Sequence, residues 1–235
     1  DVGAKEATPI QKLYIGLPEG NNHSLFNAEG EIGRVCGGCA AIALFNQAGN
    51  APSFGGGFKG SLRGGAPVTT LIDAPSLRRR VWENVLPLSE VRRLLPEFGS
   101  HAEERPVWVD PIATNKSFPA ADIGLLRGLF WQPARVELLA VDGGKCDHCG
   151  NEANKNYAGF YKEKFNYQLE GVWPHPHSPR LWEEKKGQRE VRFASFTTNA
   201  PAWTQLTQFL LTPEESKEGH VPAAVVSSRR QRRSG

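Results

Sequence analysis

Four cysteines are the residues whose type and spacing point most clearly to chemistry. They form two Cys-x-x-Cys pairs, Cys36 with Cys39 and Cys146 with Cys149, and no cysteine is left over. Four thiolates suit a tetrahedral metal ion, for which zinc is the usual choice. A thioredoxin-like redox pair would leave the second pair idle, and disulfides would need an oxidising compartment. We therefore predict one structural zinc ion that joins two distant segments of the chain.

A glycine-rich stretch over residues 51–65 is the second candidate. Its glycines formally match the dinucleotide-binding fingerprint, but that fingerprint must open a helix, and here further glycines and Pro67 follow. We therefore reject dinucleotide binding. Two interpretations remain open: a plain surface turn, or a site where backbone N–H groups approach a partner closely. Lys59 and Arg63 beside the glycines would favour an anionic partner such as nucleic acid.

Two further segments carry functional residue types. Between residues 159 and 167, aromatic side chains are interleaved with Lys162 and Lys164, a pattern often found on nucleic-acid-binding surfaces. The alternative is a strand with its aromatics inward and its lysines outward. His175 and His177 have the H-x-H spacing of some metal hydrolases, but no motif supplies further ligands. Three prolines within seven residues instead favour a rigid extended loop there.

The elements that must position these residues are short. Gly and Pro number 25 and 17, which predicts many loops, and the net charge of +3 excludes a strongly basic, histone-like protein. No apolar run approaches the roughly 20 residues of a membrane span. We expect an irregular α+β domain. Helices are predicted over 40–47, 77–85, 88–95, 122–131 and 201–211, and strands over 67–72, 107–109, 136–141, 165–170, 189–198 and 222–226.

Several long motifs occur together in this chain. The most unusual are Lys162-Glu-Lys-Phe165 and Trp173-Pro-His-Pro-His-Ser-Pro179. The others are Cys36-Gly-Gly-Cys-Ala-Ala-Ile-Ala-Leu-Phe-Asn-Gln47, Phe54-Gly-Gly-Gly-Phe-Lys59, Arg63-Gly-Gly-Ala-Pro-Val-Thr-Thr70 and Arg127-Gly-Leu-Phe-Trp-Gln-Pro133. In this combination they closely resemble one family, the large subunit (CasA) of the type I-E CRISPR surveillance complex Cascade. The resemblance runs in order from about Thr8 to Val226.

The resemblance implies a domain organisation. Because the chain begins at Asp1 and contains no methionine, we interpret it as a fragment of a longer protein. Residues 1–228 correspond to the later part of the family's N-terminal α+β domain. Residues 229–235 are a basic tail that would lead into the family's C-terminal four-helix bundle. The family's strand-separating glutamine wedge would lie beyond Gly235, so we do not expect this chain alone to open DNA.

The resemblance also implies a function that is not enzymatic. The family belongs to an RNA-guided antiviral complex of the prokaryotic cytoplasm, with no membrane partner. It recognises the protospacer-adjacent motif of double-stranded DNA from the minor groove and supports recruitment of the helicase–nuclease. The implied partners are the other Cascade subunits, the guide RNA, the target DNA and that helicase–nuclease. The alternative is a zinc-stapled protein-interaction domain that makes no direct DNA contact.

Residue by residue, the resemblance assigns the DNA-binding role to Gly55, Gly56, Gly57 and Lys164. The neighbouring Lys59 joins this set because of its positive charge beside the loop. The resemblance assigns contact with the guide-RNA end of the complex to Phe26 and Asn27, and it matches the four cysteines to the family's zinc site. The minor groove presents mainly hydrogen-bond acceptors, so backbone N–H groups and a lysine suit it. Ser53 stands where the family has another glycine, which predicts a tighter start to the loop.

Overall fold

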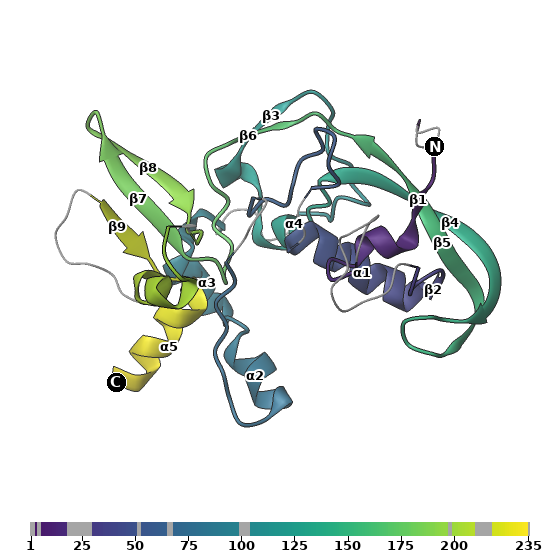
Figure 1. Cartoon of the computed structure of the whole chain (residues 1–235). Coiled ribbons are helices and arrows are strands. Elements are labelled where there is room, and N and C mark those ends of the chain that lie inside the picture. Colours follow the sequence, from purple (N-terminus) through teal and green to yellow (C-terminus); the bar gives the residue numbers. More distant parts are fainter. Residues whose placement is uncertain are drawn as a thin grey trace. The chain divides into compact units, whose positions relative to one another are not determined.

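The computed structural model describes residues 3, 6–17, 30–50, 53–64, 68–98, 104–196, 199–209 and 218–234. It confirms an α+β fold of short helices and short strands (Figure 1). The chain divides into two compact units. Unit 1 consists of Asp1–Gly65, Val107–Lys116 and Phe130–Tyr167, and unit 2 of Ala66–Pro106, Ser117–Leu129 and Gln168–Gly235. Within the described residues, no helix has the length and apolar character needed to cross a membrane.

Unit 1 is built on a long antiparallel hairpin of β4 (Ala134–Lys145) and β5 (Glu152–Lys164), seen as the curved teal ribbons of Figure 1. Two short strands, β1 (Thr8–Pro9) and β2 (Val35–Cys36), also pair with β5. The helix α1 (Gly37–Gly49) and the 3-10 helix η1 (Ile10–Leu13) contribute apolar residues to the same core. That core includes Ile10, Leu13, Val35, Ala40, Ala43, Phe54 and Phe160.

Unit 2 contains a three-stranded antiparallel sheet of β7 (Arg180–Lys185), β8 (Gln188–Phe193) and β9 (Glu218–Val221), with β7 in the middle. A second, parallel pair joins β3 (Ser117–Pro119) to β6 (Gln168–Glu170). The helices are α2 (Leu77–Glu83), α3 (Leu88–Leu94), α4 (Leu125–Leu129) and α5 (Ala224–Ser234), with 3-10 turns η2 (Pro96–Phe98), η3 (Ala120–Asp122) and η4 (Ala202–Phe209).

The segment with Trp173, His175 and His177 packs inside unit 2. The Trp173 indole is buried and donates its N–H to the Ile123 carbonyl at 3.0 Å. His177 donates its backbone N–H to His175 Nδ1 at 3.1 Å, and its own Nε2 lies 2.9 Å from the Asn84 carbonyl. Both imidazoles therefore hold the loop in place. Among the described residues, the His, Cys, Asp and Glu side chains gather closely enough to hold a metal only at the four cysteines.

Three predicted strands are wrong. Residues 68–72 and 107–109 form no strand, and 222–226 begins α5 instead. A short apolar run does not by itself distinguish a buried strand from a buried helix turn. Here Ala223, Val225 and Val226 are buried, and the run continues into the helix-forming residues that follow. In the predicted strand over 165–170, only β6 is a strand, because Asn166 adopts a positive φ of 52° and interrupts it.

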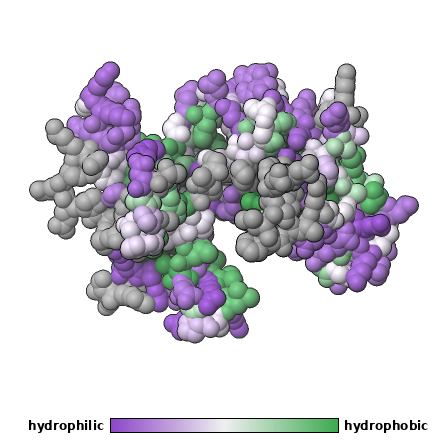
Figure 2. Space-filling model, viewed as in Figure 1, coloured by the Kyte–Doolittle hydropathy of each residue, from purple (hydrophilic) through white to green (hydrophobic). Residues whose placement is uncertain are grey.

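The helix α2 leaves its apolar side chains exposed. Leu77 and Val81 are 76% and 56% exposed, and Val85, just after the helix, is 52% exposed. Trp82 is also exposed, and Figure 2 shows a green, hydrophobic patch over α2. Ser76 caps the start of the helix, and its hydroxyl accepts the Arg79 N–H.

Candidate functional site

The two Cys-x-x-Cys turns, here called knuckles, are brought together by the sheet of unit 1. Cys36 ends β2 and caps α1, and Cys39 lies in the first turn of that helix. The second knuckle, Cys146 to Cys149, is the loop between β4 and β5. Because β2 pairs with β5 at Cys36 and Asn156, both knuckles meet at one end of the sheet.

The four sulfur atoms have the geometry of a single metal site. All four Sγ atoms lie within 4.8 Å of one another, and Cys36 Sγ lies 3.8 Å from Cys149 Sγ. A tetrahedral zinc ion with Zn–S bonds of about 2.3 Å requires sulfurs roughly 3.8 Å apart. The predicted gathering of the cysteines is confirmed, and the residues fit a zinc ion with only a small contraction.

The surroundings of the sulfurs favour a thiolate at Cys146. Burial opposes its ionisation, but hydrogen bonds from the backbone of Cys149, Cys36 and His148 outweigh burial and lower the pKa of the Cys146 thiol to about 6. One of these bonds, from Cys36 N, is 3.3 Å long. Burial raises the pKa of the Cys39 thiol, so a nearby cation would favour its thiolate form. Metal binding would therefore release protons.

Asp147 joins the second knuckle to the segment that leads into the first knuckle. One oxygen of its carboxylate accepts the backbone N–H groups of Gly33 and Arg34, each at 2.8 Å. The Asp147 N–H in turn donates to the Arg34 carbonyl at 3.1 Å. Gly150 closes the knuckle with a φ of 75°, a conformation that suits glycine. These bonds fix the direction in which the sulfurs point.

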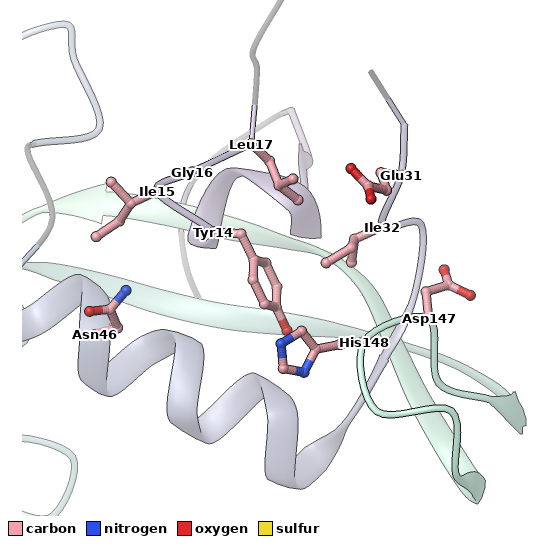
Figure 3. A pocket seen from close by; sticks show the side chains of 9 residues that line it. All are labelled: Tyr14, Ile15, Gly16, Leu17, Glu31, Ile32, Asn46, Asp147 and His148. Atoms are coloured by element: carbon pink, nitrogen blue, oxygen red, sulfur yellow. The ribbon is translucent and has the colours of Figure 1, made fainter. Parts of the chain in front are cut away.

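His148 lies beside the cysteine cluster, although no motif in the sequence predicted a role for it. Its Nδ1 lies 3.3 Å from Cys39 Sγ, and its ring centroid is 5.2 Å from that of Tyr14. A pocket of about 420 Å³ lies against these two rings (Figure 3). Figure 3 shows Tyr14 and His148 meeting at its centre, with the Glu31 and Asp147 carboxylates to one side. The only sequence signal was the position of His148 inside the second knuckle.

The glycine-rich loop of unit 1 adopts a conformation that requires its glycines. Gly55, Gly56 and Gly57 have φ values of 78°, 51° and 80°, and all three are exposed. The Phe58 N–H closes the turn on the Gly55 carbonyl at 3.0 Å. Ser53 accepts the Gly55 N–H through its hydroxyl at 3.3 Å, which makes the start of the loop tight, as its sequence predicts.

The loop lies against the end of β5 that carries Lys164. A Cβ atom added to Gly57 would lie 3.2 Å from Lys164 Nζ, so the ammonium group sits directly beside the glycine backbone. Phe54 is buried on Phe160 of β5, with ring centroids 5.4 Å apart, and so anchors the loop to the strand. Gly55, Gly56, Gly57 and Lys164, which are far apart in sequence, therefore share one surface. Lys59 is exposed on the same loop.

Arg63 does not belong to that surface, although the sequence analysis placed it there. It is buried, and its Nη1 donates to the Gly49 carbonyl at 3.2 Å and to Asn50 Oδ1 at 2.7 Å. Burial lowers the pKa of its guanidinium to about 10, which leaves it charged near neutral pH. Its side chain ties the loop to the end of α1.

We expect Arg63→Ala to destabilise the protein. The change removes a buried side chain and its two part-buried hydrogen bonds to the Gly49 carbonyl and Asn50 Oδ1, at a cost of about 1.5–3 kcal/mol. Urea unfolding of the two forms measures the loss. If Arg63→Ala unfolds at the wild-type midpoint, the anchoring role is wrong.

Phe26 and Asn27 lie outside the described residues. Their assignment stays a prediction.

Comparisons with known proteins bear on the whole chain. A family model described as CRISPR-associated protein Cse1 matches residues 2–235. Two solved structures from Thermus thermophilus are similar in fold. A crystal structure of CasA has 18% sequence identity to this chain and a TM-score of 0.50. A structure of CasA (Cse1) has 16% sequence identity and a TM-score of 0.51. Each match covers 98% of this chain but only 42% and 44% of the Thermus chains, respectively. Because the family model matches nearly the full length, the chain belongs to the Cse1 family of CRISPR-associated proteins.

Proposed function

We propose that this chain recognises the protospacer-adjacent motif of double-stranded DNA from the minor groove, through Gly55, Gly56, Gly57 and Lys164. The observation that carries the proposal is the position of Lys164 Nζ directly beside the Gly57 backbone. The loop offers backbone without side chains, and the lysine offers a flexible donor. The minor groove offers mainly acceptors, so the two surfaces are complementary.

Lys59 supplies a second kind of contact in this proposal. It is exposed two residues after Gly57, on the part of the loop that follows the turn. A lysine beside a groove-reading loop suits the DNA phosphates, which carry no sequence information but fix the register. Recognition of a short motif by protein would leave the longer sequence to base pairing with a guide RNA, as in other RNA-guided systems.

The four-cysteine cluster would hold one zinc ion in a structural role. Four protein ligands leave no open coordination position, and we propose no catalytic residue in this chain. The ion would supply a rigid joint between α1 and the β4–β5 hairpin. Because the glycine loop packs on β5, this joint would also support the DNA-binding surface.

Family membership further supports a set of partners: the other Cascade subunits, the guide RNA, the target DNA and the helicase–nuclease, in a prokaryotic cytoplasm. Phe26 and Asn27 would face the guide-RNA end of the complex. A second candidate function, a protein-interaction domain without DNA contact, is favoured by the exposed apolar face of α2 at Leu77, Val81 and Trp82. The two functions make different predictions for Lys164.

The test uses the complete guide-RNA complex, reconstituted with the full-length protein. We expect Lys164→Ala to lower the preference for motif-containing over motif-free duplexes about 10-fold or more, since one good base-edge contact is worth roughly 1–3 kcal/mol. Lys155→Ala is the matched control, because it removes the same charge from an exposed position of β5 at the other end of the strand. Equal discrimination by wild type and Lys164→Ala would favour the protein-interaction function.

A further inference from the structure

We propose that Lys162 is a further cation of the DNA interface, one that binds a backbone phosphate, and that Phe58 is the positioning residue that holds Lys162 and Lys164 at the edge of the glycine loop. The inference rests on the proposed function for its ligand. It adds to Lys59 a second phosphate contact, at Lys162, and it adds an aromatic ring that positions both Lys162 and Lys164.

The pleat of β5 places the two lysines on one face. Residues two apart on a strand point to the same side, so Phe160, Lys162 and Lys164 form one row. Phe160 is fully buried under Phe54 of the loop, whereas Lys162 is half-buried and Lys164 exposed. The row therefore rises from the core to the surface along the side of the glycine loop.

Two aromatic rings of the loop meet these ammonium groups. Lys162 Nζ lies 5.4 Å from the centroid of Phe54 and 5.6 Å from that of Phe58. Lys164 Nζ lies 5.3 Å from the same Phe58 ring. All three distances are within the roughly 6 Å range of a cation–π attraction. Phe58 is the ring that the two lysines share.

The arrangement explains how the turn and the lysines form one site. Phe54 and Phe58 flank the three glycines, and their rings meet edge to face at 6.0 Å. The rings hold the ammonium groups through their electron-rich faces. Each ammonium group carries three N–H donors, so a lysine held in this way can also bind a ligand. Two cations beside one ring repel each other, so the site gains from an anion.

The positions of the two lysines indicate that they make different contacts with DNA. Lys164 is next to the Gly57 backbone and therefore next to whatever the loop reads. Lys162 is set back between two rings, off the tip of the turn. Phosphates line both edges of the minor groove, so a cation set back from a groove-reading loop faces a phosphate. A phosphate contact strengthens binding to every sequence equally, whereas a base-edge contact discriminates.

The first experiment measures binding of the complete complex to motif and motif-free duplexes over a range of salt concentrations. We expect Lys162→Gln to weaken binding to both duplexes by a similar factor. The slope of log affinity against log salt should fall by about 0.9, the value for one lost phosphate contact. Lys164→Gln should instead reduce discrimination. An unchanged slope for Lys162→Gln overturns the phosphate role.

The second experiment tests Phe58 as a positioning residue. Phe58→Leu keeps an apolar side chain but removes the aromatic face, so both the salt slope and the discrimination should fall. Phe58→Tyr keeps the aromatic face and should restore both. The control is Phe45→Leu, which alters an aromatic pair with Phe130 in the same unit. If Phe58→Leu and Phe58→Tyr have the same salt slope and the same discrimination, the positioning role is wrong.

The two proposals fail in different ways. If wild type shows no preference for the motif, the proposed function fails, yet the salt slope of Lys162→Gln still decides the phosphate site. If wild type discriminates and Lys164→Gln does not, the proposed function stands whatever Lys162 does. Zinc content and complex assembly, measured for every variant, separate loss of contact from loss of fold.

Discussion

Replacing Cys146 with serine in the full-length protein should abolish zinc binding and strongly destabilise unit 1. Cys146 is a fully buried member of the cluster, and its sulfur accepts the Cys36 N–H. Structural zinc contributes about 10–16 kcal/mol in small zinc-finger peptides, against a total stability of about 5–15 kcal/mol for a typical domain. Unit 1 also has an apolar core, so the loss here should be smaller but still large. Metal analysis and thermal unfolding measure both effects.

Chelation provides the matched comparison. Wild type treated with a strong chelator should lose its zinc and unfold at a lower temperature, and added zinc should restore it. Cys146→Ser should gain nothing from added zinc. If the purified wild type contains no zinc, or if the variant unfolds at the wild-type temperature, the cysteines have no structural metal role.

Gly57→Ala in the complete complex should remove most of the discrimination between motif and motif-free duplexes. Gly57 has a φ of 80°, and the added Cβ would lie 3.2 Å from Lys164 Nζ. The change therefore strains the turn by about 1–2 kcal/mol and displaces the lysine. It also puts a methyl group on the backbone that would approach the groove. Competition binding with the two duplexes measures the loss, which we expect to be at least about 10-fold.

Gly187→Ala is the control for backbone strain. Gly187 has a φ of 74° in the turn between β7 and β8 of unit 2, and nothing lies within 4 Å of its added Cβ. The two substitutions should therefore cost similar stability, but only Gly57→Ala should change motif discrimination. A loss of discrimination in both variants would trace the effect to stability alone.

The cysteine cluster was predictable because its residue type and spacing carry the chemistry themselves. The helix α1 and the strand β8 also follow from local pattern, whereas the strand β7 was not predicted. The partnership of Phe58 with Lys162 and Lys164 is different, because it depends on how a loop packs onto a strand about a hundred residues later. Aromatic residues interleaved with lysines fit a plain amphipathic strand equally well.

The burial of Arg63 could not be predicted from the sequence either. An arginine in a polar, glycine-rich stretch reads as exposed, because charged residues are rarely buried. Its burial depends on acceptors that the end of α1 supplies, Gly49 and Asn50. The exposed face of α2 has a related cause, since an apolar stripe at helical spacing predicts a covered face but not what covers it.

The most direct test of minor-groove recognition changes the DNA rather than the protein. At a G·C pair of the motif, 3-deazaguanine in place of guanine removes only the minor-groove N3 acceptor, whereas 7-deazaguanine removes only the major-groove N7 acceptor. Binding of the complete complex to each duplex is measured in competition with the unmodified one. Recognition by donors in the minor groove predicts that 3-deazaguanine lowers the relative affinity about five-fold or more and that 7-deazaguanine leaves it nearly unchanged. Sensitivity to 7-deazaguanine alone would place recognition in the major groove and show that the minor-groove assignment is wrong.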